Sequence, residues 1–358
     1  MLHALDKSSP STVSNLEFAQ LLSDSGCMDL AAHGKIFQAY KLNKKVLEIL
    51  DTLGATHQKP LRSDALVIIG FCTDFMALSK RAEGLQTRLE CVEIREQCYR
   101  EICRDDLTIH DKIRLHNSYT DLACSYQQTN NFDKVRKYAE QCYKQYQTWG
   151  TEDEYPYEYA KYYNHMAYVL LYENDGQRAV EFAKRGYKLV EKASPDTGTA
   201  VLYRFDYANI VFQVGRHQES LLILNQLLKS SERDCGRNGV RTLDIRLNIG
   251  IVSYMMGDLV YAENQIREAI ASNKGNQWPV ENIIRAEYYL SQVLKLARPH
   301  EDEWRDLECQ ASKDMKSILR HDDLHKAGIL DDNLAMVFDY LVHWECRLVT
   351  PRNCSNYT

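Results

Sequence analysis

The chain has 358 residues, 44% of them hydrophobic and 26% charged, which is enough apolar material for a sizeable core. Its 16 glycines and 7 prolines are about half of average usage, which excludes collagen-like and low-complexity chains and indicates few turns. The formal net charge of −6 argues against a protein whose main task is to grip phosphate backbones, so we expect no nucleic-acid partner.

Targeting signals are not evident in the sequence. The first six residues lack the cationic and apolar regions of a secretory signal. The most apolar windows, residues 65–72 and 221–228, are far shorter than the roughly 20 residues that span a bilayer. The 11 cysteines fall mostly in amphipathic helical patterns, which favours reduced thiols. We therefore expect a cytoplasmic protein with no membrane partner.

From the N-terminus, residues 1–12 are expected to be a flexible lead-in, and residues 13–329 to form a repeat array. Each strong copy places a small residue after a large apolar one, and two weaker copies centre on Cys27 and Gly70. The small residues recur at spacings of 44, 41, 42 and 41 residues, at Ala123, Ala167, Ala208, Gly250 and Ser291.

A second small residue follows about twelve positions after the first, and a turn signal lies between the two. These signals are Gly34, Asn130-Asn131, Asp175-Gly176, Gly215 and Gly257-Asp258. Small residues at both points allow two helices to approach closely, and the turn residues end one helix and start the next. The pattern predicts about seven antiparallel helix pairs.

The end of the chain shows one more helical pattern. Leu334, Phe338 and Leu341 recur at helical spacing, which predicts an amphipathic helix over residues 330–349 that caps the open end of the array. Residues 350–358 are expected to be a flexible tail.

The repeat resembles the tetratricopeptide repeat (TPR) in its long variety of about 42 residues. The pattern of residues 163–169, the turn at residues 257–263 and residues 288–291 carry the resemblance, which covers residues 15 to 320. This variety is similar to the repeats of kinesin light chains and of fungal MalT-like and NB-ARC-associated regions. The resemblance implies an all-α, right-handed superhelical solenoid, which serves as a protein-binding scaffold.

The first helix of each pair is expected to line the concave face of the solenoid. Counting outward from the small residues predicts a groove with aromatic and amide side chains, which suits a protein or peptide partner. The predicted groove residues are Lys161, Asn164, Tyr168, Tyr172, Phe205, Asn209, Phe212, Tyr254, Tyr288 and Gln292. Any of the aromatic residues could instead plug the core between stacked helices.

Candidates for chemistry are few. His165, Asp206 and Asp244 lie near the same surface, so an alternative is that the groove binds an apolar small molecule and acts on it as an acid/base enzyme of cyclase or isomerase type. Hydrogen bonds between adjacent helices explain the same three residues, so enzyme activity is left uncertain. His321 and His325 lie one helical turn apart but lack the rest of a metal motif, so we expect no metal and no cofactor.

Overall fold

The computed structural model describes residues 15–26, 35–54, 58–195, 197–273, 278–320, 323–324, 328–329 and 333–351. Cys27, Gly34, His321 and His325, which the sequence analysis names, lie outside these residues, as do the expected lead-in and most of the expected tail. In the part that is described, every regular element is helical.

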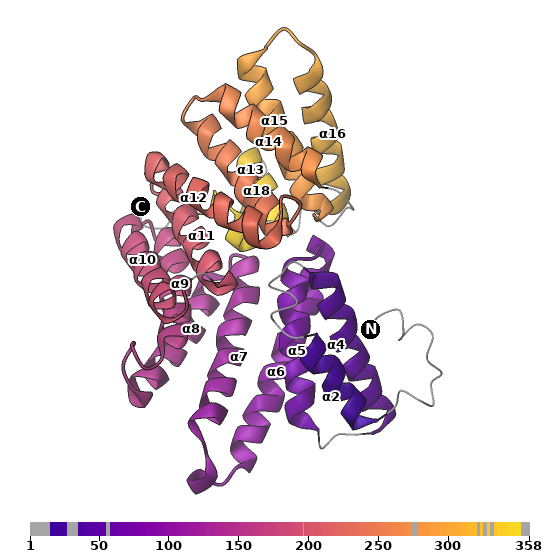
Figure 1. Ribbon diagram of the computed structural model, residues 1–358, viewed down its shortest axis with the longest axis vertical. Coiled ribbons are helices and arrows are strands. Elements are labelled where there is room, and N and C mark those ends of the chain that lie inside the picture. The colour runs from indigo at the N-terminus through magenta and orange to yellow at the C-terminus, as the bar shows by residue number, and fades with distance from the viewer. Residues whose placement is uncertain are drawn as a thin grey trace.

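Within the described ranges, seven antiparallel helix pairs follow one another and stack into a right-handed superhelix (Figure 1). The pairs are α2 (Leu16–Ser25) with α4 (Ile36–Thr52), α5 (Lys59–Asp74) with α6 (Arg81–Glu101), α7 (Ile109–Gln128) with α8 (Phe132–Trp149), α9 (Pro156–Tyr172) with α10 (Gly176–Ala193), α11 (Gly198–Gln213) with α12 (His217–Cys235), α13 (Val240–Met255) with α14 (Leu259–Ser272), and α15 (Val280–Ala297) with α16 (Glu303–Ile318). The all-α solenoid predicted from the repeats is confirmed.

Small residues are buried where helices meet, as the repeat spacing predicts. All four small residues that carry a side chain are fully buried: Ala123, Ala167, Ala208 and Ser291. At Gly250 a Cβ atom would lie 2.5 Å from Cγ1 of Ile266, on the partner helix α14. The period of the sequence is therefore set by close approach of the two helices in a pair.

The turns within the pairs repeat with the same period. The second residue after the first helix has a positive φ at Asn130 (58°), Asn174 (65°), Gly215 (83°) and Gly257 (84°). Glycine and asparagine tolerate this left-handed conformation better than other residues, which explains their recurrence. In three of these turns the residue that follows directly caps the second helix with its side chain; these residues are Asn131, Asp175 and Asp258.

The C-terminal segment (residues 333–351) differs from the predicted capping helix over 330–349. Its helix, α18, spans only Leu334–Leu341, and the chain then continues through a short 3₁₀ turn, η4 (Trp344–Cys346). Val342 is extended, and its carbonyl accepts hydrogen bonds from Arg81 and Gln128 of the array. The helix stops because array side chains satisfy the main chain there, and the segment runs along the inner face of the solenoid.

The two ends of the array approach one another around this segment. The 3₁₀ turn η2 (Leu78–Lys80) precedes α6, and the N–H of Leu78 donates to Glu281 Oε1 of α15 at 2.6 Å. The second and seventh pairs therefore meet across the superhelix. Side chains of the C-terminal segment, among them Phe338 and Leu341, belong to the largest hydrophobic core of the described residues.

Candidate binding groove

The predicted groove residues fall into a buried and a half-buried set. Lys161, Tyr172, Tyr254 and Gln292 are half-buried and bond or pack within the array; for example, Lys161 donates to Asn117 at 2.9 Å and Gln292 donates to Glu308 at 2.9 Å. The others are buried: Asn164, Tyr168, Phe205, Asn209, Phe212 and Tyr288. Tyr168, Asn209 and Tyr288 contact the C-terminal segment directly.

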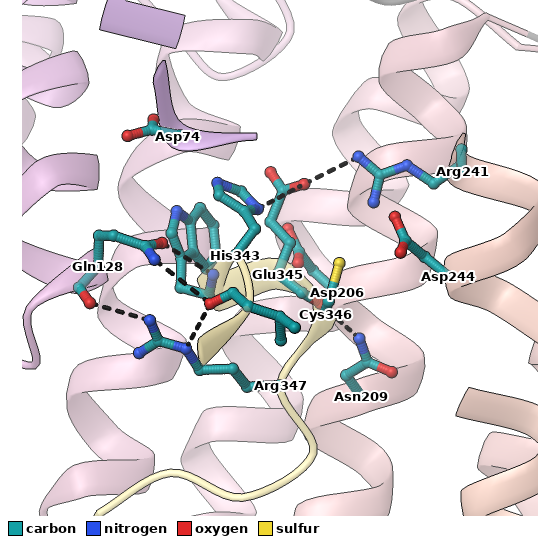
Figure 2. Close-up of polar contacts among 12 residues, drawn as sticks. Asp74, Gln128, Asp206, Asn209, Arg241, Asp244, His343, Glu345, Cys346 and Arg347 are labelled. Carbon is teal, nitrogen blue, oxygen red and sulfur yellow. Dashed lines mark hydrogen bonds and ion pairs between the residues drawn. The ribbon is translucent and has the colours of Figure 1, made fainter. Parts of the chain in front are cut away.

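Amide side chains of three first helices bond the main chain of the segment, and Figure 2 shows two of them, Gln128 and Asn209. From α11, Asn209 donates to the carbonyl of Glu345 at 2.6 Å, and from α13, Asn248 donates to that of Cys346 at 3.2 Å. Gln128, at the end of α7, donates to the carbonyl of Val342 and accepts the N–H of Trp344 at 2.9 Å. These hydrogen bonds are all made to main-chain groups of the segment.

Two arginines of the groove pair with carboxylates of the segment. Arg285 Nε lies 2.7 Å from Asp339 Oδ1, and both side chains are almost completely buried. Arg241 Nη2 lies 3.0 Å from Glu345 Oε2. Because buried charges are tolerated only when they are paired, these two contacts determine where the segment can lie.

A third arginine, Arg81 of α6, binds the end of α18. Its Nη2 atom donates to the carbonyls of Tyr340, Leu341 and Val342 at 2.7 to 3.0 Å. These are carbonyl groups at a helix C-terminus, which lack partners within the helix and attract a cation. Arg81 therefore joins α18 to the second helix pair.

Aromatic rings surround the middle of the segment. His343 stacks on Phe75 with the ring centroids 4.1 Å apart, and Trp344 meets Tyr168 edge to face at 5.0 Å. Burial, and next the positive charge of Arg241, holds the pKa of His343 well below its usual value, so this ring is neutral at pH 7. The aromatic side chains of the groove thus pack against a segment of the same chain.

The three residues of the enzyme alternative are buried and are hydrogen-bonded to neighbouring helices. His165 contacts Gln127, Asp206 accepts from Asn164 and Tyr168, and Asp244 accepts from Trp278 and Asn282. Within the described residues, no hydrogen bond joins any two of the three. Burial, then the charge of Lys161, lowers the pKa of His165 to about 4.

Asp206 is a fully buried acid with a second carboxyl group close to it. Burial and the nearby carboxylate of Glu345 raise the pKa of Asp206 well above its usual value. Its hydrogen-bond partners, Asn164 and Tyr168, are neutral, whereas Glu345 has the Arg241 guanidinium beside it. The proton that this pair of carboxyl groups retains therefore belongs on Asp206.

Part of the groove is open to solvent. A cleft of about 640 Å³ lies where the segment leaves the concave face, and its wall includes Phe212 and Met255 of the array and Leu348 of the segment. Phe212 is a predicted groove residue, and Met255 is 53% exposed. The volume lies in the range of small-ligand and peptide side-chain pockets.

The sequence analysis did not include Arg81, Arg241 and Asn248 in the site. Their role depends on the C-terminal segment, which lies about a hundred residues away from Arg241 and Asn248 in sequence and about 260 away from Arg81, so local periodicity carries no signal for it. The dense alternation of polar and apolar residues in His343-Trp344-Glu345-Cys346-Arg347 is the one hint that this stretch is not a simple amphipathic helix.

No group of three or more His, Cys, Asp or Glu side chains in the described ranges is arranged to hold a metal ion. No helix in those ranges combines the length and the apolar character that crossing a bilayer requires.

No protein-family model and no curated protein sequence matches this chain. Solved structures do match. A Rap protein complexed with competence and sporulation factor superposes with a TM-score of 0.56 at 14% identity, over 90% of this chain and 80% of that one. BtubC (BKLC) from P. vanneervenii has a TM-score of 0.50 at 16% identity, over 65% of this chain and 90% of that one.

A putative kinesin light chain with TPR-like repeats from Podosopora anserina is also similar, with a TM-score of 0.45 at 16% identity, over 57% of this chain and 96% of that one. Identities this low show the fold alone. The fold of this chain is that of the TPR-like helical repeat proteins, as the sequence resemblance implies.

Proposed function

We propose that this protein is a repeat scaffold that binds a protein or peptide partner through its concave groove. The observation that carries the proposal is the set of amide side chains, Gln128, Asn209 and Asn248, that bond main-chain groups of the C-terminal segment. Main-chain hydrogen bonds give affinity for extended chain, and side-chain pockets add specificity.

The geometry of the groove supports this function in a second way. Aromatic rings at Phe75, Tyr168 and Tyr288 supply contact area on the same surface that carries the amides. Aromatic and arginine side chains are the residue types that dominate binding energy at interfaces, and both are concentrated here. The Rap neighbour, whose structure contains competence and sporulation factor, offers an analogy for a ligand bound to this fold.

The experiment uses two exposed apolar residues on neighbouring helices. A display library of 12-residue peptides is selected on the intact chain, and affinities are measured by fluorescence anisotropy for Met255→Lys and for Val260→Lys. Met255 lines the open cleft, whereas Val260, 74% exposed, does not. We expect Met255→Lys to weaken binding of the selected peptides by about tenfold or more, and Val260→Lys to leave it unchanged.

Both variants place lysine at an exposed position, so both should fold, and melting curves check this. Equal affinity for the two variants would place the peptides outside the groove and overturn the proposal. Failure to select any peptide that binds the intact chain would overturn it as well.

A further inference from the structure

The C-terminal segment makes the contacts of a bound ligand. It supplies no helix to any of the seven pairs, and residues 319–332 separate it in sequence from α16. Array side chains bond its main chain at Val342, Trp344, Glu345 and Cys346. Such contacts depend little on the segment's own side chains, so another chain of similar backbone course can make them.

Its acidic side chains neutralise the groove. Among the described residues, Glu345 is the ion-pair partner of Arg241 and Asp339 is that of Arg285. Without the segment, the Arg285 guanidinium would lose its ion-pair partner, and Arg241 would keep near it Asp244 of α13, with which it forms no ion pair among the described residues. An uncompensated charge in such a place is strongly unfavourable, so an occupant of the groove must bring acids.

The segment does not use every donor that the groove offers. Arg241 Nη1, Arg285 Nη2 and Arg81 Nη1 are buried and have no hydrogen-bond partner among the described residues. Buried donors without acceptors weaken an interface. A chain with better-placed acceptors therefore has a route to compete with the segment.

We propose that residues 333–351 are an internal ligand of the groove, and that the partner is an acidic peptide of similar backbone course that displaces them by placing carboxylates on Arg241 and Arg285. This inference rests on the proposed peptide-binding function and adds the chemistry of the partner and the need for displacement. Asp339 and Glu345 are six residues apart, which sets the expected spacing of the two acids. The open cleft at Leu348 is where a competing chain can begin to enter.

The test keeps every residue of the chain present. A protease recognition sequence is inserted after Gly328, where a glycine with φ of 68° has no atom within 4 Å of the Cβ position, and the folded protein is cleaved there. A fluorescein-labelled peptide of residues 333–351 is then added, and anisotropy and native mass spectrometry follow its uptake and the release of the original fragment.

We expect the labelled peptide to replace the fragment in a one-to-one complex. A peptide with Asp339→Asn and Glu345→Gln should bind at least about 30-fold more weakly, because each buried arginine then lacks a charged partner. A control peptide with Leu334→Ser, a residue that is 40% exposed, should bind like the original.

Three results would overturn the inference. Exchange that occurs only at the temperature of global unfolding would show that the segment cannot leave the groove while the array stays folded. If the peptide with Asp339→Asn and Glu345→Gln bound as tightly as the original peptide, the partner would not need acidic residues. The proposed peptide binding would still stand, because it is tested separately at Met255. Complexes that contain two protein copies with exchanged segments would identify a second copy as the occupant.

Discussion

Arg285 of α15 and Asp339 of α18 form a buried ion pair, with Nε 2.7 Å from Oδ1 and almost no exposed surface on either side chain. The second oxygen of Asp339 accepts the main-chain N–H groups of Leu348 and Val349 at 2.6 and 2.7 Å. One carboxylate therefore holds the end of the C-terminal segment against its beginning and attaches both to the array.

Asp339→Asn should destabilise the protein strongly. The substitution leaves Arg285 buried without an anion, which costs about 3 kcal/mol or more of unfolding free energy. Urea denaturation measures the loss. The matched control is Asp302→Asn, which removes the acid of an exposed pair with Arg305 and should have little measurable effect. Similar losses for the two variants would contradict the role assigned to Asp339.

The titration of Asp206 should make the unfolding free energy depend on pH. Because the folded state raises the pKa of Asp206, it binds this proton more tightly than the unfolded chain does. The resulting stabilisation is complete below about pH 4 and is lost as the pH rises through the folded pKa. Asp206→Asn mimics the protonated acid at every pH, so it removes this dependence.

The measurement is the unfolding free energy of wild type and Asp206→Asn at pH 5 and pH 8. The unfolding free energy of the variant relative to that of the wild type should increase with pH, by up to about 1.4 kcal/mol per pH unit, which is the slope for one proton. Asp302→Asn serves again as the exposed control. A difference between variant and wild type that stays constant over this range would show that Asp206 is ionised throughout.

Gly250→Ala should destabilise the protein although alanine is the better helix former. Helix propensity alone favours alanine over glycine by about 1 kcal/mol. The new methyl group would lie 2.5 Å from Cγ1 of Ile266, and such overpacking costs about 1–3 kcal/mol. Thermal unfolding shows whether Gly250→Ala lowers or raises the stability of the protein.

A double-mutant cycle identifies the cause of that loss. If Ile266 is the obstacle, Gly250→Ala combined with Ile266→Ala should cost less than the sum of the single changes. Strict additivity, or stabilisation by Gly250→Ala alone, would mean that helix spacing does not require glycine at this position.

The amides of the groove should protect the C-terminal segment from proteases. Replacing Asn209 and Asn248 together by alanine removes the donors to the carbonyls of Glu345 and Cys346, each at a cost of about 1–3 kcal/mol. Trypsin should then cleave after the buried Arg347 at least about tenfold faster than in wild type. Gln310→Ala, an exposed amide on α16, is the control and should leave the rate unchanged.

The repeat array could be predicted from the sequence because its contacts are local. Each helix pair buries its apolar face against the next pair. Small residues and turn residues therefore recur at a regular spacing along the chain and can be counted. The same counting placed Tyr168 and Asn209 on the inner face, where the structure brings them to the C-terminal segment. The local pattern also predicted a helix near the end of the chain, of which Leu334–Leu341 is helical.

Which segment occupies the groove could be learned only from the tertiary structure. Residues 342–351 leave the helical path because Arg81, Gln128, Asn209 and Asn248 supply hydrogen bonds that a helix would otherwise make within itself. Those partners lie between about 100 and 260 residues away in sequence. The sequence by itself determined a superhelix of antiparallel helix pairs, since its period is a local property. Only the folded chain decides that the concave face is filled from within, because that contact joins residues far apart in the sequence.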